Sequence, residues 1–533
     1  EVASAQTLTV DDDGSSDHDG IQAAIDAAKT GDTIEVKPGT YDESPKIDKD
    51  RITLRGPNNG TSATESRHSE ATIRGTVSID GASGVTVDGF KIAEGGSELT
   101  SGVSIQPKSS GAEGITVNNS IIENMSKAGG GGSGDFTFGI LSFGGNLSDV
   151  TISDNRIANV GVPGGTQGVA VSLENLTGTT AGSGATIERN TIRNISSISS
   201  KQTQRPGTGI ALRPNFKGNN SAADIGSNSF AELEIAVSHP QGDTATVDRT
   251  ELATVVVDDP NQNQQRIFTP TVQDAVAAAG QDAVVEVGPG NYAESVTIDE
   301  KGLTLEGPNA GTPGDGDRGP EATIKQGIQV TADDVRIDGV EVTNDETNGI
   351  LLKSAPSGVV VTNTVVRDIS GDGGGSKAAG NGINLQFTGA FKETSTGIEI
   401  TNNLIRDIST PDIDGPSADA IGVQLLPRGN DVKNLLIRDN VIADIQPGTA
   451  SDGRSEARAI SIDTQFTDKP GGGGDGSGDS GQATSLNISE NEMDNLTADF
   501  ARAITLFEDK SKNTPGDTNL GPTDFEITGN IVS

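Results

Sequence analysis

A short motif recurs along the whole chain, and it leaves few folds open. It reads apolar, Thr or another residue, apolar, two polar residues, and often an Asn. Its copies are Val85–Val87, Ile115–Val117, Val150–Ile152, Ala185–Ile187, Ala223–Ile225, Val335–Ile337, Val359–Val361, Ile398–Ile400, Leu435–Ile437, Leu486–Ile488 and Phe525–Ile527. Between these copies lies a second motif, Gly-apolar-x-apolar, which begins at Gly102, Gly139, Gly168, Gly209, Gly349, Gly382 and Gly422. Alternation of period two is typical of strands. Each repeat therefore predicts three short strands, one coil of a parallel β-helix.

An Asn stands at the same place in most repeats. Because a bend there must tolerate left-handed geometry and satisfy backbone groups, Asn suits it better than most residues. We therefore predict a hydrogen-bonded ladder of stacked side chains, formed by Asn155, Asn190, Asn228, Asn403, Asn440, Asn491 and Asn530.

The two halves of the chain are also related to each other, at an offset of about 250 residues. Ile21–Ile25 matches Val272–Val276, and Pro38–Glu43 matches Pro289–Glu294. Each half opens with apolar residues at helical spacing, which predicts a short helix that covers the open end of the first coil. The sequence thus predicts an all-β fold of two tandem right-handed parallel β-helix domains, residues 1–245 and 246–533, each with an N-terminal capping helix.

On these motifs the chain resembles the pectin-lyase-like superfamily of right-handed β-helices, over essentially all its length. The resemblance implies a groove beside the Gly-apolar strands in which a polysaccharide can lie. The segment Gly134–Gly139 is also similar to a stretch of pectin methylesterases, which would make Asp135 a nucleophile. That family needs an Arg-x-Trp element as well, and this chain has no Trp, so we interpret Asp135 as a loop residue.

Composition restricts the partners. The formal net charge is −38, which repels nucleic acid and anionic membranes. Such a charge, spread along the chain, is typical of proteins dissolved in molar salt, so we predict a haloarchaeal secreted or surface protein. The alternative is an ordinary acidic secreted protein. The absence of Cys excludes disulfides and thiolate chemistry.

Secretion is favoured by nine Asn-x-Ser/Thr sequons, and no apolar run is long enough to span a membrane. The glycosylation candidates are Asn59, Asn118, Asn124, Asn146, Asn175, Asn194, Asn219, Asn487 and Asn495.

Insertions flank the Gly-apolar strand in many repeats, as at residues 370–381, 409–420 and 446–458. Loops on both sides of one sheet predict a groove along the solenoid. The side chains expected to point outward into it, as possible glycan contacts, are Gln106, Ser172, Arg213, Lys353, Gln386 and Asp463. Only Asp463 among them is acidic, and we expect no two adjacent coils to place acids together. Arg213 and Lys353 could contact a uronate or sulfate, although solvated surface cations are the simpler interpretation.

Evidence for a metal is weak. His18, His68 and His239 are isolated in the sequence and are interpreted as ordinary surface histidines. Residues 11–13, 315–317 and 471–481 could bind Ca²⁺, but without the repeated ligands of a calcium loop they are better interpreted as solvated turns.

Two functions remain open. The first is a non-catalytic extracellular structural protein, a surface, filament or matrix component that self-associates or binds other surface proteins, with possible glycan contact. It is favoured by the lack of paired acids and by a final repeat, Ile531–Ser533, without an obvious cap. The alternative is a polysaccharide lyase or glycosidase acting beside the Gly-apolar strands.

Overall fold

The computed structural model describes residues 5–93, 100–126, 136–161, 166–178, 183–196, 198–200, 203–205, 207–213, 222–240, 245–259, 262–371, 377–387, 393–427, 430–451, 454–463, 483–507 and 523–533. The chain divides into two compact units. Unit 1 comprises Glu1–Asp248 and Val256–Pro270, and unit 2 comprises Arg249–Val255 and Thr271–Ser533. A domain boundary at 245/246 stays a prediction.

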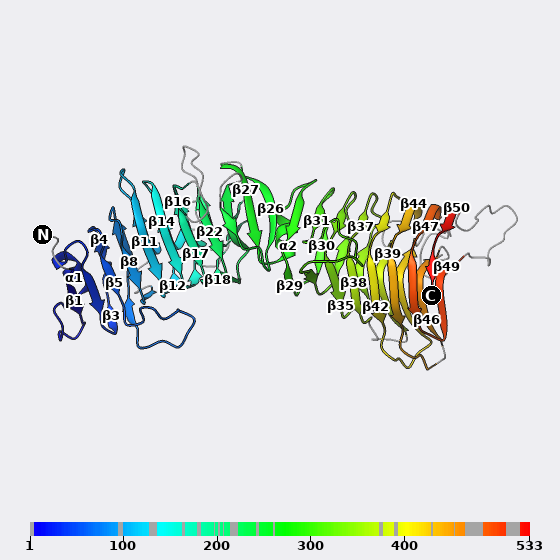
Figure 1. The fold of residues 1–533 in the computed structure, drawn as a ribbon, viewed down its shortest axis with the longest axis horizontal. Helices are drawn as coiled ribbons and strands as arrows, with labels where there is room; N and C mark the ends of the chain where they lie inside the picture. Colours follow the sequence, from blue (N-terminus) through cyan, green and yellow to red (C-terminus); the bar gives the residue numbers. More distant parts are fainter. Residues whose placement is uncertain are drawn as a thin grey trace. The chain divides into compact units, whose positions relative to one another are not determined.

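Unit 1 is built from three parallel sheets, which we name after the motifs that form them (Figure 1). The Thr sheet contains β1 (Thr7–Val10), β2 (Thr33–Val36), β5 (Thr53–Arg55), β8 (Thr86–Asp88), β11 (Ala112–Asn118), β14 (Leu147–Ser153), β17 (Ala185–Glu188), β22 (Ala223–Gly226) and β25 (Thr246–Val247). The Asn sheet contains β3 (Gly39–Tyr41), β6 (Ala71–Ile73), β9 (Lys91–Ala93), β12 (Ile121–Met125), β15 (Arg156–Val160), β18 (Thr191–Ile195) and β23 (Ser229–Ala231). The Gly sheet contains β4 (Lys46–Ile47), β7 (Val77–Asp80), β10 (Ser101–Gln106), β13 (Phe136–Ser142), β16 (Gln167–Glu174), β21 (Thr208–Arg213) and β24 (Ile235–Pro240). A hairpin of β19 (Ile198–Ser200) and β20 (Thr203–Arg205) is antiparallel.

Unit 2 repeats the three sheets. Its Thr sheet contains β28 (Val284–Val287), β31 (Thr304–Glu306), β34 (Arg336–Asp338), β37 (Val360–Thr362), β40 (Thr394–Thr396), β41 (Glu399–Thr401), β44 (Asp431–Arg438), β47 (Ala483–Ser489) and β50 (Thr523–Thr528). Its Asn sheet contains β29 (Gly290–Tyr292), β32 (Ala322–Ile324), β35 (Glu341–Asn344), β38 (Val365–Ile369), β42 (Leu404–Ser409), β45 (Val441–Gln446), β48 (Glu492–Leu496) and β51 (Ile531–Val532). Its Gly sheet contains β30 (Val296–Ile298), β33 (Ile328–Val330), β36 (Asn348–Leu352), β39 (Lys377–Gln386), β43 (Ser417–Leu426), β46 (Ser455–Asp463) and β49 (Phe500–Phe507). The predicted parallel β-helix is confirmed.

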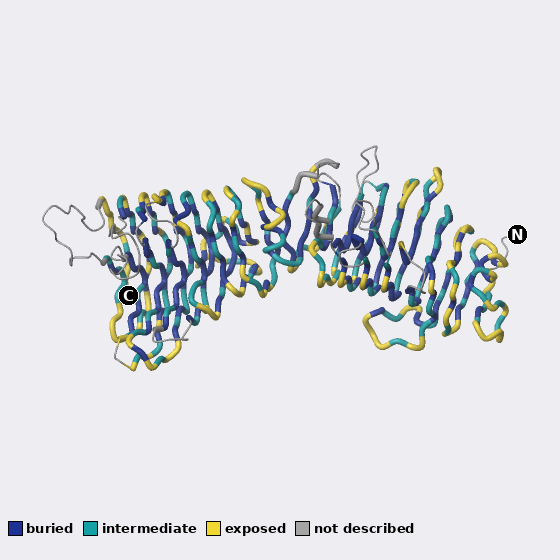
Figure 2. The backbone as a smooth tube through the Cα atoms, turned by 180° about the vertical axis from the view of Figure 1, so that it is seen from behind, coloured by how far each residue is buried: buried dark blue, intermediate teal, exposed yellow. Residues whose placement is uncertain are grey.

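The core of each unit is a stack of aliphatic side chains. Along many strands, buried residues alternate with more exposed ones (Figure 2), whereas β10, β16 and β21 of the Gly sheet are buried over almost their whole length. In the Gly sheet of unit 2, for example, Ile383 pairs in register with Val423 and then Ile460, and all three are fully buried. Like residues therefore stack on like, and the core needs few aromatic side chains.

The Asn ladder is present in both units. Asn155, Asn190 and Asn228 are linked from side chain to side chain at 3.0 Å. In unit 2, Asn403, Asn440, Asn491 and Asn530 are linked in the same way, at 2.9 to 3.0 Å. Each ladder Asn also donates to a backbone carbonyl of the preceding coil, as Asn440 does to Ile400 at 2.8 Å.

The left-handed geometry was predicted for the wrong residue. It belongs to the residue before the ladder Asn, as at Asp154 (φ 58°), Arg189 (φ 54°) and Glu490 (φ 57°). The ladder Asn is therefore conserved along the coils for its hydrogen bonds and not for its backbone angle, and the bend itself accepts several residue types.

Both predicted capping helices are present, α1 (Ile21–Ala27) and α2 (Val272–Ala278). The first two N–H groups of α1 donate to the Glu43 carboxylate at 2.6 and 2.8 Å, and those of α2 donate to Glu294 at 2.7 and 3.0 Å. The Glu of the Pro-Gly-x-Tyr-x-Glu segment is thus a helix cap, which satisfies donors that a helix start leaves unpaired. No helix in the described ranges is long and apolar enough to cross a membrane.

An antiparallel strand pairs with the last strand of the Gly sheet in unit 1. Another antiparallel strand pairs with the first strand of the Thr sheet in unit 2. In unit 1, β27 (Gln262–Thr269) pairs with β24. In unit 2, Ala253 and Thr254, the first two residues of β26 (Ala253–Asp259), pair with β28. His239 on β24 is 5% exposed and stacks on Phe268 at 5.7 Å, so its interpretation as a surface histidine was wrong. Burial lowers the pKa of His239, and Arg266 lowers it further, against the hydrogen bond to the Pro240 carbonyl.

We predict that Asn440→Ala destabilises unit 2 by about 3 kcal/mol, because it removes the donor to the Ile400 carbonyl and leaves the buried Asn403 N–H without its acceptor. Urea unfolding followed by circular dichroism measures the change.

Asn487→Ala is the matched control. Its side chain is half-buried on the outer face of β47 and donates to Glu526 at 3.2 Å, so its loss is expected to cost less than about 1 kcal/mol. Equal losses for the two variants would show that the ladder has no special role in stability.

Candidate functional site

The predicted contact residues of unit 1 lie on its Gly sheet, but in a different register from the expected one. Gln106 pairs with Asp80 on the neighbouring strand and donates to Ser104 at 3.1 Å. Arg213 pairs with Glu174, whereas Ser172 pairs with Ala211 two positions earlier and is fully buried. Glu174 therefore occupies the row in which we expected Ser172.

This part of unit 1 combines aromatic and charged side chains. Phe136 and Phe138 stack with 6.0 Å between ring centroids, and the Arg213 guanidinium lies 5.4 Å from the centre of the Phe136 ring. Burial raises the pKa of Glu174 above its ordinary value, against the opposing charge of Arg213. A raised carboxyl pKa is common at functional sites, although structural pairs show it too.

The predicted contacts of unit 2 are spread along its Gly sheet. Lys353 is half-buried directly after β36, and Gln386 is half-buried at the end of β39, where it pairs with Leu426. Asp463 ends β46 and pairs with Phe507, and its side chain lies outside the described part of the structure. Leu352 pairs with Leu385 and Leu425 pairs with Ile462, so these three residues stand in one row, in which Leu426 separates Gln386 from Asp463.

A different set of side chains does form a continuous row on the outer face of the same sheet. Four of them are paired in register on successive strands, namely Asn384, Gln424, Ser461 and Thr505. Beside this row, Asn348 pairs with Asn381. The core residues Ile383 and Leu385 flank Asn384 and are fully buried, so the amide points to the opposite face. We call these six residues, Asn348, Asn381, Asn384, Gln424, Ser461 and Thr505, the polar row.

The polar row holds hydrogen-bonding capacity that the described residues do not use. Asn381 and Asn384 both donate to the Asn348 side-chain oxygen, at 3.1 and 2.7 Å. Their own Oδ1 atoms are buried and accept no hydrogen bond from any described residue, and the same holds for Thr505 Oγ1. Because unpaired buried polar atoms are costly and rare, such a cluster marks a place where a ligand can be recognised.

Two acids and two arginines lie beside the polar row. Asp419 on β43 pairs in register with Glu456 on β46, so the expectation that adjacent coils keep acids apart was wrong. The Glu456 carboxylate binds Arg458 and, at 2.8 Å, Arg502. Burial alone would raise the pKa of Glu456, but the hydrogen bond from Arg458 and the charges of both arginines hold that pKa below its ordinary value. Glu456 is thus ionised and paired.

The sequence patterns missed this site because the strands begin earlier than the Gly-apolar motif indicates. β39 begins at Lys377, β43 at Ser417 and β46 at Ser455, within segments that we had predicted to be insertions. The signal that could have revealed the site was the polar residue directly after the first core position of each motif, as at Asn384 and Gln424.

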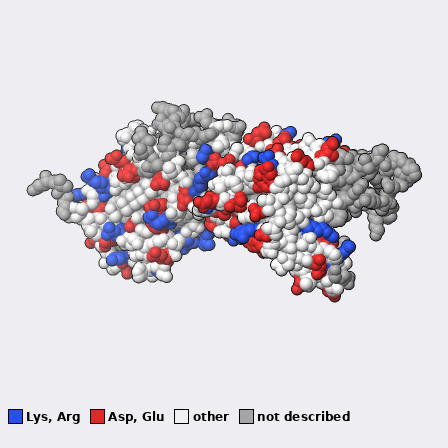
Figure 3. Space-filling model, turned by 45° about the vertical axis from the view of Figure 1, so that its right-hand side comes forward, with Lys and Arg blue, Asp and Glu red and all other residues white. Residues whose placement is uncertain are grey.

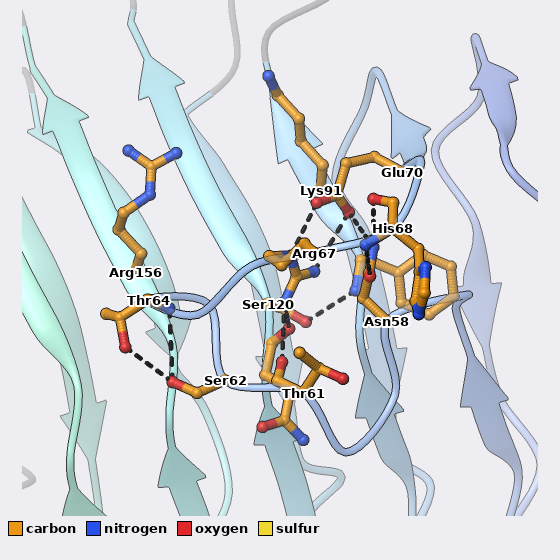
Figure 4. Close-up of polar contacts among 12 residues, drawn as sticks. Asn58, Thr61, Ser62, Thr64, Arg67, His68, Glu70, Lys91, Ser120 and Arg156 are labelled. Carbon is orange, nitrogen blue, oxygen red and sulfur yellow. Dashed lines mark hydrogen bonds and ion pairs between the residues drawn. The ribbon is translucent and has the colours of Figure 1, made fainter.

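Figure 4 shows a charged cluster of unit 1, centred on Arg67 in the loop between β5 and β6. Arg67 binds the Glu70 carboxylate at 2.7 and 3.2 Å and donates to the carbonyls of Thr61 and Asn119 at 2.9 and 2.7 Å. The Arg67 side chain is only 6% exposed. Its donors therefore fix the loop to the coil that contains Asn119.

This cluster, which we call the arginine clasp, is structural. Unit 2 repeats it with Arg318, which binds Glu321 at 2.6 Å and donates to the Asn363 carbonyl at 2.8 Å. His68, exposed in unit 1, has Gly319 at its place in the duplicate. Unit 2 forms the same contacts without an imidazole, so the arginine clasp does not need His68. His68 therefore has no acid or base role in the clasp.

An acidic column runs along the outside of unit 2. Asp368, Asp407, Asp444 and Asn495 precede residues paired in register on successive strands, and each has a left-handed backbone. Burial raises the pKa of Asp407, as do the charges of Asp444 and Asp368, against the charge of Arg406. Within the described ranges no group of three or more His, Asp or Glu side chains is placed to hold a metal ion. The interpretation of residues 11–13 and 315–317 as solvated turns stays a prediction, and residues 471–481 and Asp135 lie outside the described part.

The glycosylation candidates differ in accessibility. Asn175 is 7% exposed and donates to the Gly144 carbonyl at 2.6 Å, so its amide is not presented to solvent. Asn219 lies outside the described residues. Asn118 and Asn487 are half-buried, and the exposed candidates are Asn59, Asn124, Asn146, Asn194 and Asn495.

No protein-family model matches the sequence, and no curated protein matches it. Among solved structures, a DFA-IIIase from Arthrobacter chlorophenolicus A6 is 12% identical, covers 96% of this chain and 92% of its own, and gives a TM-score of 0.21. A family 28 exopolygalacturonase from Yersinia enterocolitica is 11% identical, with coverage of 98% and 78% and a TM-score of 0.19. A PL6 family alginate lyase is 11% identical, with coverage of 99% and 100% and a TM-score of 0.22. Similarity this low says nothing about the activity of this chain.

We predict that Arg67→Ala destabilises unit 1 by about 3 kcal/mol, because it leaves the Glu70 carboxylate and two backbone carbonyls without their shared donor. The free energy of unfolding in urea measures the loss.

Arg55→Ala provides the comparison. Arg55 lies 3.7 Å from Glu35, and its side chain is 42% exposed, so this variant is expected to change the free energy of unfolding by less than about 1 kcal/mol. If the two variants are equally stable, the arginine clasp is only a surface ion pair.

Proposed function

We propose that this chain is an extracellular glycan-binding β-helix protein, and that the glycan lies along the polar row of unit 2. One observation carries the proposal. Amides and hydroxyls occupy the same outward position on four successive strands, and buried oxygens among them have no described partner. Adjacent strands are about 4.8 Å apart, so the row offers regularly spaced groups to an extended ligand with repeated hydroxyls.

The row is accessible at its middle and beside its last strand. Gln424 is half-buried, and the side chain of Arg502 is 40% exposed. Figure 3 shows acidic and basic side chains mixed over the surface it presents, as expected for a solvated exterior. The polar row differs from such a surface because its members are mostly buried amides and hydroxyls.

Glycan binding is tested by affinity electrophoresis of the full chain through gels that contain soluble polysaccharides. Retardation by at least one polymer is expected, and Gln424→Ala is expected to weaken it about tenfold, which corresponds to about 1.4 kcal/mol. Asn384→Ala is the second variant, at the buried end of the row.

Asn487→Ala again serves as control, because it removes an amide from the outer face of a different sheet of the same unit. It is expected to leave the retardation unchanged. The proposal fails if no polymer retards the protein, or if Asn487→Ala and Gln424→Ala weaken the retardation equally while both variants keep the native circular dichroism spectrum.

Lyase or glycosidase activity is the alternative, and the register pair of Asp419 and Glu456 is the observation that favours it. A carboxyl group that acts as general acid must be protonated, but the paired arginines keep Glu456 ionised. We therefore expect retarded polysaccharides to gain no reducing ends and no unsaturated uronate absorbance. Release of either would make this face an active site.

Assembly is a second function favoured by a specific observation. On the last described coil, inward positions are exposed, with Phe525 at 52%, Ile527 at 40% and Ile531 at 61%, whereas Leu486 and Ile488 one coil earlier are each 2% exposed. We propose that these side chains are covered either by further residues of the protein or by another molecule of the chain, in a surface layer, filament or matrix.

Light scattering tests the assembly. Association that increases with protein concentration is expected in molar salt, where the repulsion from the net charge is screened to about 3 Å. Ile527→Lys is expected to abolish it. The assembly idea is wrong if the full chain stays monomeric at all concentrations, or if Ile527→Lys associates as the parent does.

A further inference from the structure

We infer that the glycan recognised by the polar row is an uncharged, polyhydroxylated chain and not a polyuronate or a sulfated chain. This inference rests on the proposed function and adds the chemical class of the ligand. It differs from the sequence-based expectation that Arg213 or Lys353 would contact a uronate or sulfate.

The first reason is the kind of atom left without a partner. Asn381 Oδ1 and Asn384 Oδ1 only accept hydrogen bonds, and one N–H of each amide donates to Asn348. A ligand that satisfies them must therefore donate. Sugar hydroxyls donate, whereas carboxylate and sulfate groups at neutral pH only accept, so an anionic substituent placed against these two oxygens could not satisfy them.

The second reason is that the nearby cations are engaged. Arg458 and Arg502 both bind the Glu456 carboxylate, and Asp419 lies in register beside Glu456. These two arginines and two acids sum to zero charge. A polyanion that drew either arginine away from Glu456, whose side chain is only 8% exposed, would leave that carboxylate without its compensating charge.

The third reason is the electrostatics of the whole chain, whose net charge of −38 repels polyanions at low ionic strength. This contribution is screened in molar salt, but the hydrogen-bond requirement is not. The two effects can therefore be separated by salt.

The experiment compares matched polymers. A dextran, a galactomannan and hydroxyethyl cellulose, and the carboxymethylated form of each, are used in affinity electrophoresis and calorimetry at 0.1 and 1 M NaCl, where the Debye lengths are about 10 and 3 Å. We expect the neutral form to bind at least ten times more tightly than its carboxymethylated form, and a tenfold difference to remain at 1 M NaCl.

Gln424→Lys tests the same inference from the protein side. It puts a donor with a positive charge in the middle of the row, so we expect it to strengthen binding of the carboxymethylated polymer at least fivefold at 0.1 M NaCl. Lys433→Gln, on the exposed surface of β44, is the control for a changed net charge and is expected to leave the preference as it is.

The outcomes separate the two claims. Equal or tighter binding of the carboxymethylated forms at 1 M NaCl would overturn the inference and leave glycan binding intact. Retention of none of the six polymers would overturn the proposed function and the inference with it. A preference for neutral polymers that is unchanged in Gln424→Ala and Asn384→Ala would place binding elsewhere and overturn the inference for this row.

Discussion

The coils of this protein must turn a parallel chain without leaving buried backbone groups unpaired, and from Asn155 in unit 1 and Asn403 in unit 2 onward the Asn ladder does this. At each bend the side chain donates back to a carbonyl of the preceding coil and accepts from the ladder Asn of that coil, as Asn440 does with Ile400 and Asn403. The ladder therefore links coils at the point where strand pairing is interrupted. The aliphatic side chains inside the bend can then stack uniformly, because the hydrogen bonds of the ladder already fix the orientation of each coil relative to the preceding one.

Sequence patterns predicted the coils well, since a β-helix is encoded locally and repeated. The capping helices, the ladder and the three sheets follow from the spacing of residues alone. The left-handed residue was missed because Asp154, Arg189 and Glu490 share no residue type, and only the bend relates them. The stacking also tolerates substitution. Ala170 takes the place that Gly209 occupies on the next coil, so Gly168 was aligned two residues out of register and Glu174 was overlooked.

The candidate site was less predictable, for a related reason. Inward positions reveal themselves by hydrophobicity, whereas the outward positions of a solenoid are polar almost everywhere. What distinguishes Asn381 and Asn384 is burial without partners, which depends on long strands that begin before the Gly-apolar motif. Amino-acid composition does not reveal this burial. The register pair of Asp419 and Glu456 was missed in the same way, because each acid lies in a segment that looked like an insertion.

The arginine clasp and the polar row together show how a duplicated fold separates stability from recognition. Arg67 and Arg318 make matching contacts in both units, so these contacts belong to the fold that the units share. The outer faces of the two Gly sheets have diverged instead. Unit 1 presents Phe136, Arg213 and Glu174 there, and unit 2 presents amides and hydroxyls with a neutralised ion pair beside them. Features that differ between otherwise equivalent coils are not required by the β-helix, so the divergent faces are where binding specificity is to be sought.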